Sequence, residues 1–301
     1  MRGARSWLVR GPLPVGDLCD IIGGYRGNFD GVCRKTVDAY ARCLTVLPDG
    51  RLVSGTQEGP LHVWDSELDA VMLTLQGHTA HATEIVALPD GKLASSSVDL
   101  TVRVWDMVRG LCTLTMRHYA PVFALGLLPD GNLISAGHDD AVRVWASDGH
   151  PKLVKKIANV MSMAVTSEGI ALGVPGGVKL WSMDMTACFK TLGFSGIAVP
   201  IVPLPDGKMA VSVRMDIHIV TWNDPERVTM HDGHCVDGLT PLGGGLLASC
   251  SRDNTVKVWD YRTGECLFIL KEHTRAVLTM AMWPDGRVAS CSMDRTIRVW
   301  E

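Results

Sequence analysis

The chain has 301 residues, of which 47% are apolar and 20% charged, and its formal net charge is −3. This composition is typical of a globular protein and excludes a disordered or fibrous chain, while the length allows two domains or one large all-β domain. The nearly balanced charge argues against a dedicated nucleic-acid binder, because binding phosphates needs a clustered excess of Lys and Arg.

The first 28 residues contain Arg2, Arg5 and Arg10 before the first acidic residue, Asp17. This stretch faintly resembles a transit peptide, but its composition also suits a flexible solvated leader, which we expect here. No apolar run along the chain reaches the length of a membrane span, because Pro, Gly or a charge interrupts each one. We therefore predict a leader over 1–28, a single domain over 29–301, no membrane span, and a cytoplasmic or nuclear location.

Tryptophan marks an internal repeat that covers most of the chain. The sequence has 9 Trp against 5 Phe and 4 Tyr. Seven of the tryptophans follow one another at steps of 41, 40, 36, 41, 37 and 41 residues: Trp64, Trp105, Trp145, Trp181, Trp222, Trp259 and Trp300. A tight turn, most often Leu-Pro-Asp-Gly, precedes each Trp at a nearly constant distance. A period of about 40 residues indicates a repeat architecture.

Each repeat is predicted to form four short strands. Between the turn and the Trp, apolar and polar residues alternate, as in 93–106 and 247–260, which predicts two strands joined by a short turn. One apolar strand precedes the turn, and another follows every Trp except the last. A single sheet of four strands cannot bury both of its faces, so we expect the repeats to stack radially.

The repeats resemble those of the WD40 family. The resemblance is carried by Gly77-His78, Gly233-His234, Trp64-Asp65, Trp105-Asp106 and Trp259-Asp260, and by an Asp six residues before the Trp in five repeats. It covers residues 37–301 and implies an all-β, seven-bladed β-propeller of four-stranded antiparallel blades. The seventh repeat ends on its third strand, so residues 29–36 are expected to supply the missing outer strand and close the ring.

The resemblance also implies a buried relay of hydrogen bonds in each blade, from His through Asp and a strand Ser or Thr to the Trp indole. Carried over by position, the relay is complete in four repeats: His78, Asp99 and Trp105; His118, Asp139 and Trp145; His234, Asp253 and Trp259; His273, Asp294 and Trp300. Two serines are candidates in three of these repeats (Ser95 or Ser97, Ser249 or Ser251, Ser290 or Ser292), and Ser135 is the candidate in the other. Repeats one, four and five lack part of the set, and packing is expected to replace the relay there.

The recurrence of Ser, His and Asp does not predict catalysis. A catalytic set needs one exposed nucleophile and a pocket, whereas this set recurs four times beside an indole donor. The nine cysteines are scattered without a C-x-x-C pair or a Cys/His cluster, and no phosphate-binding loop is present. We therefore predict no enzyme activity, no metal site and no cofactor. An enzyme or ligand-binding propeller that uses the central channel is the alternative.

Partner binding is predicted at two places. In WD40 proteins the residue before the turn Asp tends to face the narrow end of the channel, which here gives Gln57, Val98, His138, Val174, Met215, Arg252 and Met293. Such a mixture of apolar and polar side chains could bind a peptide, and an unused channel mouth is the other interpretation. Trp259-Asp260-Tyr261-Arg262 resembles the WDxR box of substrate receptors that dock onto the adaptor of cullin-RING ubiquitin ligases. Arg262 would then pair with an acceptor on that adaptor, although it could also be merely solvated.

The predicted function is a non-catalytic scaffold for other proteins or short peptide motifs. The more specific hypothesis is that this scaffold is a substrate receptor of a ubiquitin ligase. Nucleic-acid binding is disfavoured, because Lys152, Lys155 and Lys156 are the only local basic cluster.

Overall fold

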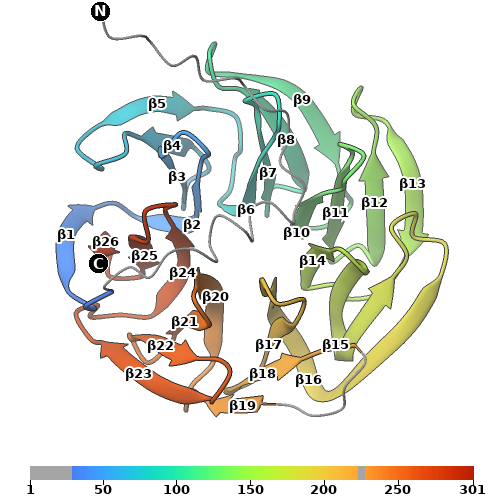
Figure 1. Ribbon diagram of the computed structural model, residues 1–301. Coiled ribbons are helices and arrows are strands. Elements are labelled where there is room, and N and C mark those ends of the chain that lie inside the picture. The colour runs from blue at the N-terminus through green and yellow to red at the C-terminus, as the bar shows by residue number, and fades with distance from the viewer. Residues whose placement is uncertain (1–28, 223–227) are drawn as a thin grey trace, which may run out of the picture.

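The computed structural model describes residues 29–222 and 228–301, so the expected leader over 1–28 lies outside the described residues. The regular secondary structure of the described part consists of β-strands alone. Its 26 strands form six antiparallel sheets. The sheets stand around a common centre in a β-propeller arrangement (Figure 1). In each sheet the successive strands lie at increasing or decreasing distance from the centre.

Four sheets consist of four consecutive strands. The first comprises β2 (Ala41–Val46), β3 (Leu52–Thr56), β4 (Leu61–Trp64) and β5 (Val71–Leu75). The second comprises β6 (Ala82–Ala87), β7 (Leu93–Ser97), β8 (Thr101–Asp106) and β9 (Leu111–Arg117). The third comprises β10 (Val122–Leu127), β11 (Leu133–Gly137), β12 (Ala141–Trp145) and β13 (Pro151–Lys156). The fourth comprises β20 (Val236–Gly243), β21 (Leu246–Ser251), β22 (Val256–Asp260) and β23 (Glu265–Leu270).

A fifth sheet joins the two ends of the described chain. It comprises β1 (Cys33–Asp38), β26 (Thr296–Trp300), β25 (Val288–Ser292) and β24 (Val277–Met282). β1 pairs antiparallel with β26, with Thr36 opposite Arg298 and Val37 opposite Ile297. The strand predicted at 29–36 therefore begins four residues later, because Asp30 and Gly31 turn there and donate their backbone N–H groups to Glu301 O at 2.9 and 2.6 Å.

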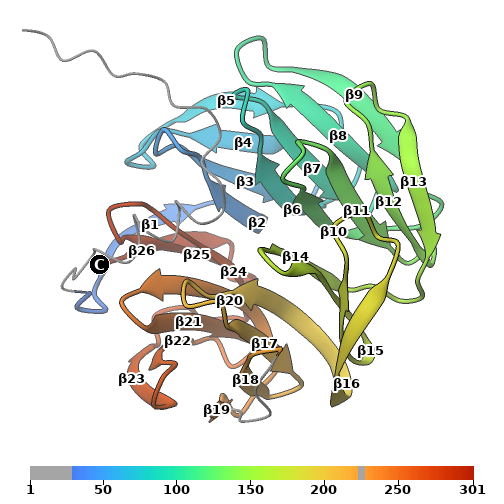
Figure 2. The same ribbon diagram turned by 45° about the vertical axis from the view of Figure 1, so that its right-hand side comes forward.

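The sixth sheet has six strands and replaces the two separate blades predicted for repeats four and five. It comprises β14 (Ser162–Thr166), β15 (Gly169–Trp181), β16 (Cys188–Pro203), β17 (Met209–Val213), β18 (Asp216–Val220) and β19 (Val228–His231). β15 and β16 have 13 and 16 residues, and Pro175 pairs with Ile197 across them. β15 doubles back within its own length, because Gly169 at its start lies against the carbonyl of Trp181 at its end, and Gly176 between them has a positive φ of 87°. Figure 2 shows β16, in yellow, extending from the right-hand side of the view toward the centre. The described residues therefore form six sheets, not seven.

The core lies between neighbouring sheets. One apolar cluster contains Leu52 and Trp64 from the first sheet together with Trp283 and Ile297 from the fifth. Trp283 is 1% exposed, and its indole N–H donates to Gly50 O at 2.8 Å, so it connects the two sheets by packing and by a hydrogen bond. Burial of apolar area is the main source of stability here, and this area is buried between the faces of neighbouring sheets.

Candidate functional site

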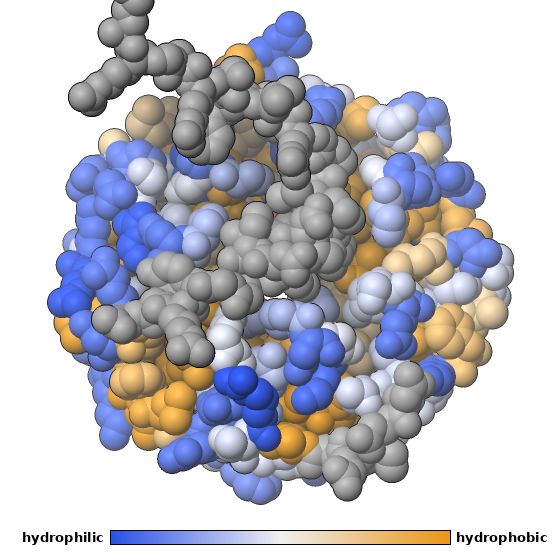
Figure 3. All heavy atoms as spheres, in the orientation of Figure 1, coloured by the Kyte–Doolittle hydropathy of each residue, from blue (hydrophilic) through white to orange (hydrophobic). Residues whose placement is uncertain are grey.

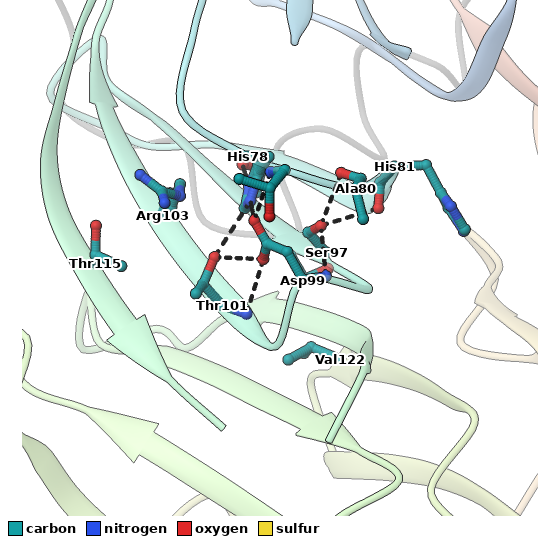
Figure 4. Close-up of polar contacts among 12 residues, drawn as sticks. His78, Ala80, His81, Ser97, Asp99, Thr101, Arg103, Thr115 and Val122 are labelled. Carbon is teal, nitrogen blue, oxygen red and sulfur yellow. Dashed lines mark hydrogen bonds and ion pairs between the residues drawn. The ribbon is translucent and has the colours of Figure 1, made fainter. Parts of the chain in front are cut away.

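The β6–β9 sheet holds a continuous chain of polar contacts from His78 to Trp105. The His78 Nδ1 lies 2.8 Å from Asp99 Oδ2, and its Nε2 lies 2.8 Å from Ser95 Oγ. The Trp105 indole donates to the same Ser95 Oγ at 2.8 Å, and Thr101 donates to Asp99 Oδ1 at 2.6 Å. Burial raises the pKa of Asp99, but the hydrogen bonds from His78 and Thr101 outweigh it and hold this pKa well below the usual range. Figure 4 shows His78, Asp99 and Thr101 turned toward one another.

The sheet of β24, β25, β26 and β1 repeats this arrangement. His273 lies 2.8 Å from both Asp294 Oδ2 and Ser290 Oγ, and Trp300 donates to Ser290 Oγ at 2.8 Å. The structure thus selects Ser95 and Ser290 from the two pairs that the sequence left open. Their neighbours Ser97 and Ser292 instead donate to loop carbonyls.

In the β10–β13 sheet an arginine joins the chain of contacts. His118 Nε2 lies 2.7 Å from Ser135 Oγ, to which Trp145 also donates at 2.7 Å. Arg143 Nη1 lies 2.6 Å from both His118 Nδ1 and Asp139 Oδ2. A guanidinium can only donate, so His118 Nδ1 accepts and the imidazole is neutral. Burial, together with the Arg143 charge, accordingly lowers the pKa of His118 to about 4.

The place of Thr101 and Thr296 is taken in this sheet by the smaller Ala141. The alanine offers Asp139 no hydroxyl donor, and Arg143 turns inward to supply one. The sequence analysis did not identify Arg143.

The β20–β23 sheet differs from the prediction. The side chain of His234 is 64% exposed and lies 3.7 Å from Asp253, away from Ser249. Asp232 takes the place of His234 in the relay. Asp232 Oδ2 accepts a hydrogen bond from Ser249 Oγ at 2.7 Å, and Ser249 Oγ accepts one from the Trp259 indole at 2.9 Å. The Lys257 ammonium bridges Asp232 and Asp253 at 2.7 and 3.1 Å.

Spacing would have identified Asp232. The first residue of the relay lies 17 positions before the serine in all four sheets, and Asp232, unlike His234, has this spacing to Ser249. The prediction followed the Gly-His dipeptide, which in this repeat lies two residues too late.

The remaining repeats keep only parts of the network. Trp64 donates to Ser54 at 2.8 Å, although Val37 stands at the His position. The Trp181 Nε1 and Ser212 Oγ atoms are buried and have no hydrogen-bond partner among the described residues. The four relay serines are 0% exposed, so no reagent in solution reaches their hydroxyls. The contacts therefore fix the strands and do not offer a nucleophile.

A cavity of about 670 Å³ occupies the centre of the propeller. Of the residues predicted at the channel mouth, Arg252 and Met293 line it. Arg252 Nε donates to both carboxylate oxygens of Asp237 at 3.2 and 3.0 Å, and Met293 is 39% exposed. The rest of the lining includes Arg42, His81, Glu84 and Asp237, which the sequence analysis missed because they lie on or beside strands identified by their apolar residues.

The other predicted mouth residues lie outside this lining, four of them on turns and Val174 on β15. The His138 ring stacks on Phe123 at 4.5 Å, and its Nε2 lies 3.0 Å from Met161 Sδ. Met215 is 50% exposed, whereas Val174 is buried. Gln57 and Val98 are partly buried.

Arg262 is held by its own sheet. Its guanidinium donates to the Gly244 carbonyl and to Asp260 Oδ1, and its backbone N–H donates to Asp260 Oδ1 at 2.9 Å. Arg262 lies on the turn between β22 and β23, and its side chain remains 58% exposed, so these contacts leave part of the cation accessible.

Two of the three lysines of β13 are engaged locally. Lys155 Nζ lies 4.3 Å from the centre of the Trp181 ring and donates to Met185 O at 2.7 Å, and Lys152 lies 3.9 Å from Asp130. Within 29–222 and 228–301, no group of three or more His, Cys, Asp or Glu side chains could hold a metal ion. The same residues contain no helix that could cross a membrane.

Hydrophilic side chains cover much of the rim in Figure 3, with an apolar patch near β23. Leu267 and Ile269 of this strand are 43% and 49% exposed.

Comparison with known families decides what these repeats are. The family model "WD domain, G-beta repeat" matches residues 70–106, 110–146, 226–260 and 264–301. The chain belongs to the WD40-repeat family. The four matched stretches contain Trp105, Trp145, Trp259 and Trp300, whose indoles donate to the four relay serines. The other three repeats stay a prediction from the sequence.

Stretches of several curated relatives are about one third identical to parts of this chain. Nuclear distribution protein PAC1 of Arthroderma benhamiae is 33% identical over 128 residues, which cover 36% of this chain and 28% of PAC1. Eukaryotic translation initiation factor 3 subunit I of Pyricularia oryzae is 37% identical over 89 residues, covering 27% and 25%. APC/C activator protein CDC20 of Saccharomyces cerevisiae is 33% identical over 123 residues, covering 36% and 19%. The chain thus spans about a quarter of the length of the relatives it matches.

Proposed function

We propose that this WD40 protein is a non-catalytic scaffold that binds segments of other proteins at the mouth of its central cavity. The observation that carries the proposal is the cavity itself, which has the size of a ligand site and combines apolar walls with a few charged groups. Met293 offers an apolar contact at this place and Arg252 a cation with a fixed direction. The names of the relatives, an initiation-factor subunit and an activator protein, support a role in assemblies.

The platform for this role is a ring of seven blade units. Two observations support this view: the six-stranded sheet contains the residues of repeats four and five, and β1 completes the sheet of β24, β25 and β26. We assign β14, β15 and the first half of β16 to one unit, and the second half of β16 with β17, β18 and β19 to the next. In this proposal β1 closes the ring, because its pairing gives β26 a neighbour on its outer side.

The test is a charge reversal at the cavity mouth with a matched control at the rim. Arg252→Glu with Met293→Asp changes the mouth, whereas Arg109→Glu with Met72→Asp makes the same changes at side chains that are 77% and 64% exposed. Both variants and the native protein are used as bait in affinity purification with mass spectrometry. Loss of partners from the mouth variant alone supports the proposal. Retention of every partner by a folded mouth variant refutes it.

A role in a ubiquitin-ligase complex is the second candidate. The similarity to CDC20, an APC/C activator protein, favours it, and the exposed part of Arg262 offers a contact for an adaptor. Arg262→Ala should then remove ligase subunits from the purified assembly, while Arg109→Ala should not. Cytoplasmic or nuclear residence is proposed with either candidate, with support from the nuclear distribution protein among the relatives.

A further inference from the structure

Glu84 places a carboxylate without a cation partner in the wall of the central cavity. It lies on β6, the inner strand of its sheet, and belongs to the cavity lining. Its Oε2 accepts a hydrogen bond from the backbone N–H of Leu125 on β10, the inner strand of the next sheet, at 2.7 Å. Among the described residues, no Lys, Arg or His forms an ion pair with it. The carboxylate is surrounded by protein, yet the cavity gives access to it.

The other charged groups of the cavity lining leave this carboxylate uncompensated. Arg252 is paired with Asp237 at 3.0 Å. Arg42, on the inner strand β2, is the second charged group of the lining that forms no ion pair within the described residues. Burial lowers the pKa of His81, as does the Arg42 charge, so this histidine is uncharged near neutral pH. Cys43 is buried, and its raised pKa of about 12 keeps the thiol neutral.

We infer that Glu84 is the receptor for a positively charged side chain, arginine above all, that a bound protein segment inserts into the cavity. This inference rests on the proposed function and names the chemistry that the site recognises. An arginine matches a carboxylate best, because its planar guanidinium donates two parallel hydrogen bonds. A cavity of about 670 Å³ is large enough for such a side chain and the adjoining peptide.

The surroundings of Glu84 also give the binding a pH dependence. Burial raises the pKa of Glu84 to about 7, and the Leu125 hydrogen bond offsets this only in part. Only the ionised carboxylate attracts a cation. The affinity therefore rises with pH and should be about tenfold higher at pH 8 than at pH 6, in proportion to the ionised fraction.

The experiment uses two capped amino acids that differ in charge and scarcely in shape. N-acetyl-arginine methylamide is the cationic probe, and N-acetyl-citrulline methylamide is its neutral counterpart. Binding of each to the full chain is measured by ligand-observed NMR titration at pH 6 and pH 8. The native protein should prefer the arginine probe about tenfold at pH 8 and lose most of this preference at pH 6.

Two variants assign the preference to its source. Glu84→Gln removes the charge but keeps an oxygen that can accept from Leu125 N–H, so the fold is retained and the preference for arginine is lost. Arg42→Gln removes the other unpaired charge of the cavity lining and should leave arginine binding unchanged or stronger. If Glu84→Gln fails to fold, the titrations of the native protein with both probes at pH 6 and pH 8 still test whether it prefers arginine and whether this preference depends on pH. Equal binding of the two probes, or a folded Glu84→Gln protein that still prefers arginine, overturns the inference.

The same variant separates this inference from the proposed function. If the mouth variant loses its partners while Glu84→Gln keeps them, the scaffold role stands and the cation site falls. If Glu84 selects the arginine probe but the mouth variant keeps every partner, the site stands and the proposed role of the cavity mouth falls.

Discussion

Asp232→Asn should destabilise the protein strongly, whereas His234→Ala should change its stability little. The Asp232 side chain is fully buried and contacts Ser249 and the Lys257 ammonium, both at 2.7 Å. The asparagine keeps the size of the residue but removes its charge, so Lys257 retains Asp253 as its single ionised partner. His234 is 64% exposed in its side chain, and its removal breaks no buried contact.

The magnitude follows from the kind of contact that is lost. Removing one partner of a buried ion pair costs about 3–5 kcal/mol, and the remaining contact with Asp253 should keep the loss near the lower end, about 3 kcal/mol. His234→Ala should stay within about 0.5 kcal/mol, as is usual for exposed side chains.

Urea unfolding followed by tryptophan fluorescence measures both values. A double-mutant cycle with Lys257→Met isolates the coupling between the two charges: the double variant should lose less stability than the sum of the single variants. Additive losses, or a larger effect at His234 than at Asp232, would refute the assignment of Asp232 to the relay.

Three further predictions follow from the fold. Deleting residues 1–34 removes the start of β1 and its bonds to β26, so the melting temperature should fall by several degrees, and an unchanged thermal melt would count against a structural role for this pairing. Trp181→Phe removes a buried N–H that has no acceptor and should be neutral or stabilising, whereas Trp105→Phe should cost about 1–2 kcal/mol by breaking the bond to Ser95; equal losses in chemical denaturation would contradict this. The pKa of Glu84, raised to about 7, makes the folded state bind a proton more tightly than the unfolded state, so stability should fall as the pH rises from 4.5 to 7; Glu84→Gln should flatten this slope, and parallel stability–pH curves would show that the carboxyl is not the cause.

The sequence predicted the parts of the fold that depend on local spacing. A tryptophan and the serine ten positions before it are hydrogen-bonded in five repeats, including the first, where packing was expected instead, and the choice between two serines in three of the others came from the structure. The inward turn of Arg143 could not be predicted in the same way, because it depends on contacts with His118 and Asp139 that form only in the folded sheet. The joining of repeats four and five in one sheet was not predicted either, because β16 continues from its pairing with β15 into its pairing with β17 where the period predicts the end of one blade and the start of the next.

The charges of the central cavity were the least predictable part of the site. Arg42, Glu84 and Asp237 lie far apart in the chain, and each lies on a strand identified mainly by its apolar residues. Their proximity results from the closing of the sheets around a centre, which no single repeat encodes. The mouth prediction placed two of its seven residues at the cavity, Arg252 and Met293, and the corresponding residues of the other repeats lie outside the lining.

The pairing of β1 with β26 also bears on how the protein is made. β1 is synthesised before every other strand of the structure, but its single neighbour in the sheet, β26, is synthesised after all of them. Until then the polypeptide emerging from the ribosome carries an edge strand with no partner, a state that favours association with other chains. The protein should therefore depend on chaperones during translation more than a protein whose strands all pair with near neighbours.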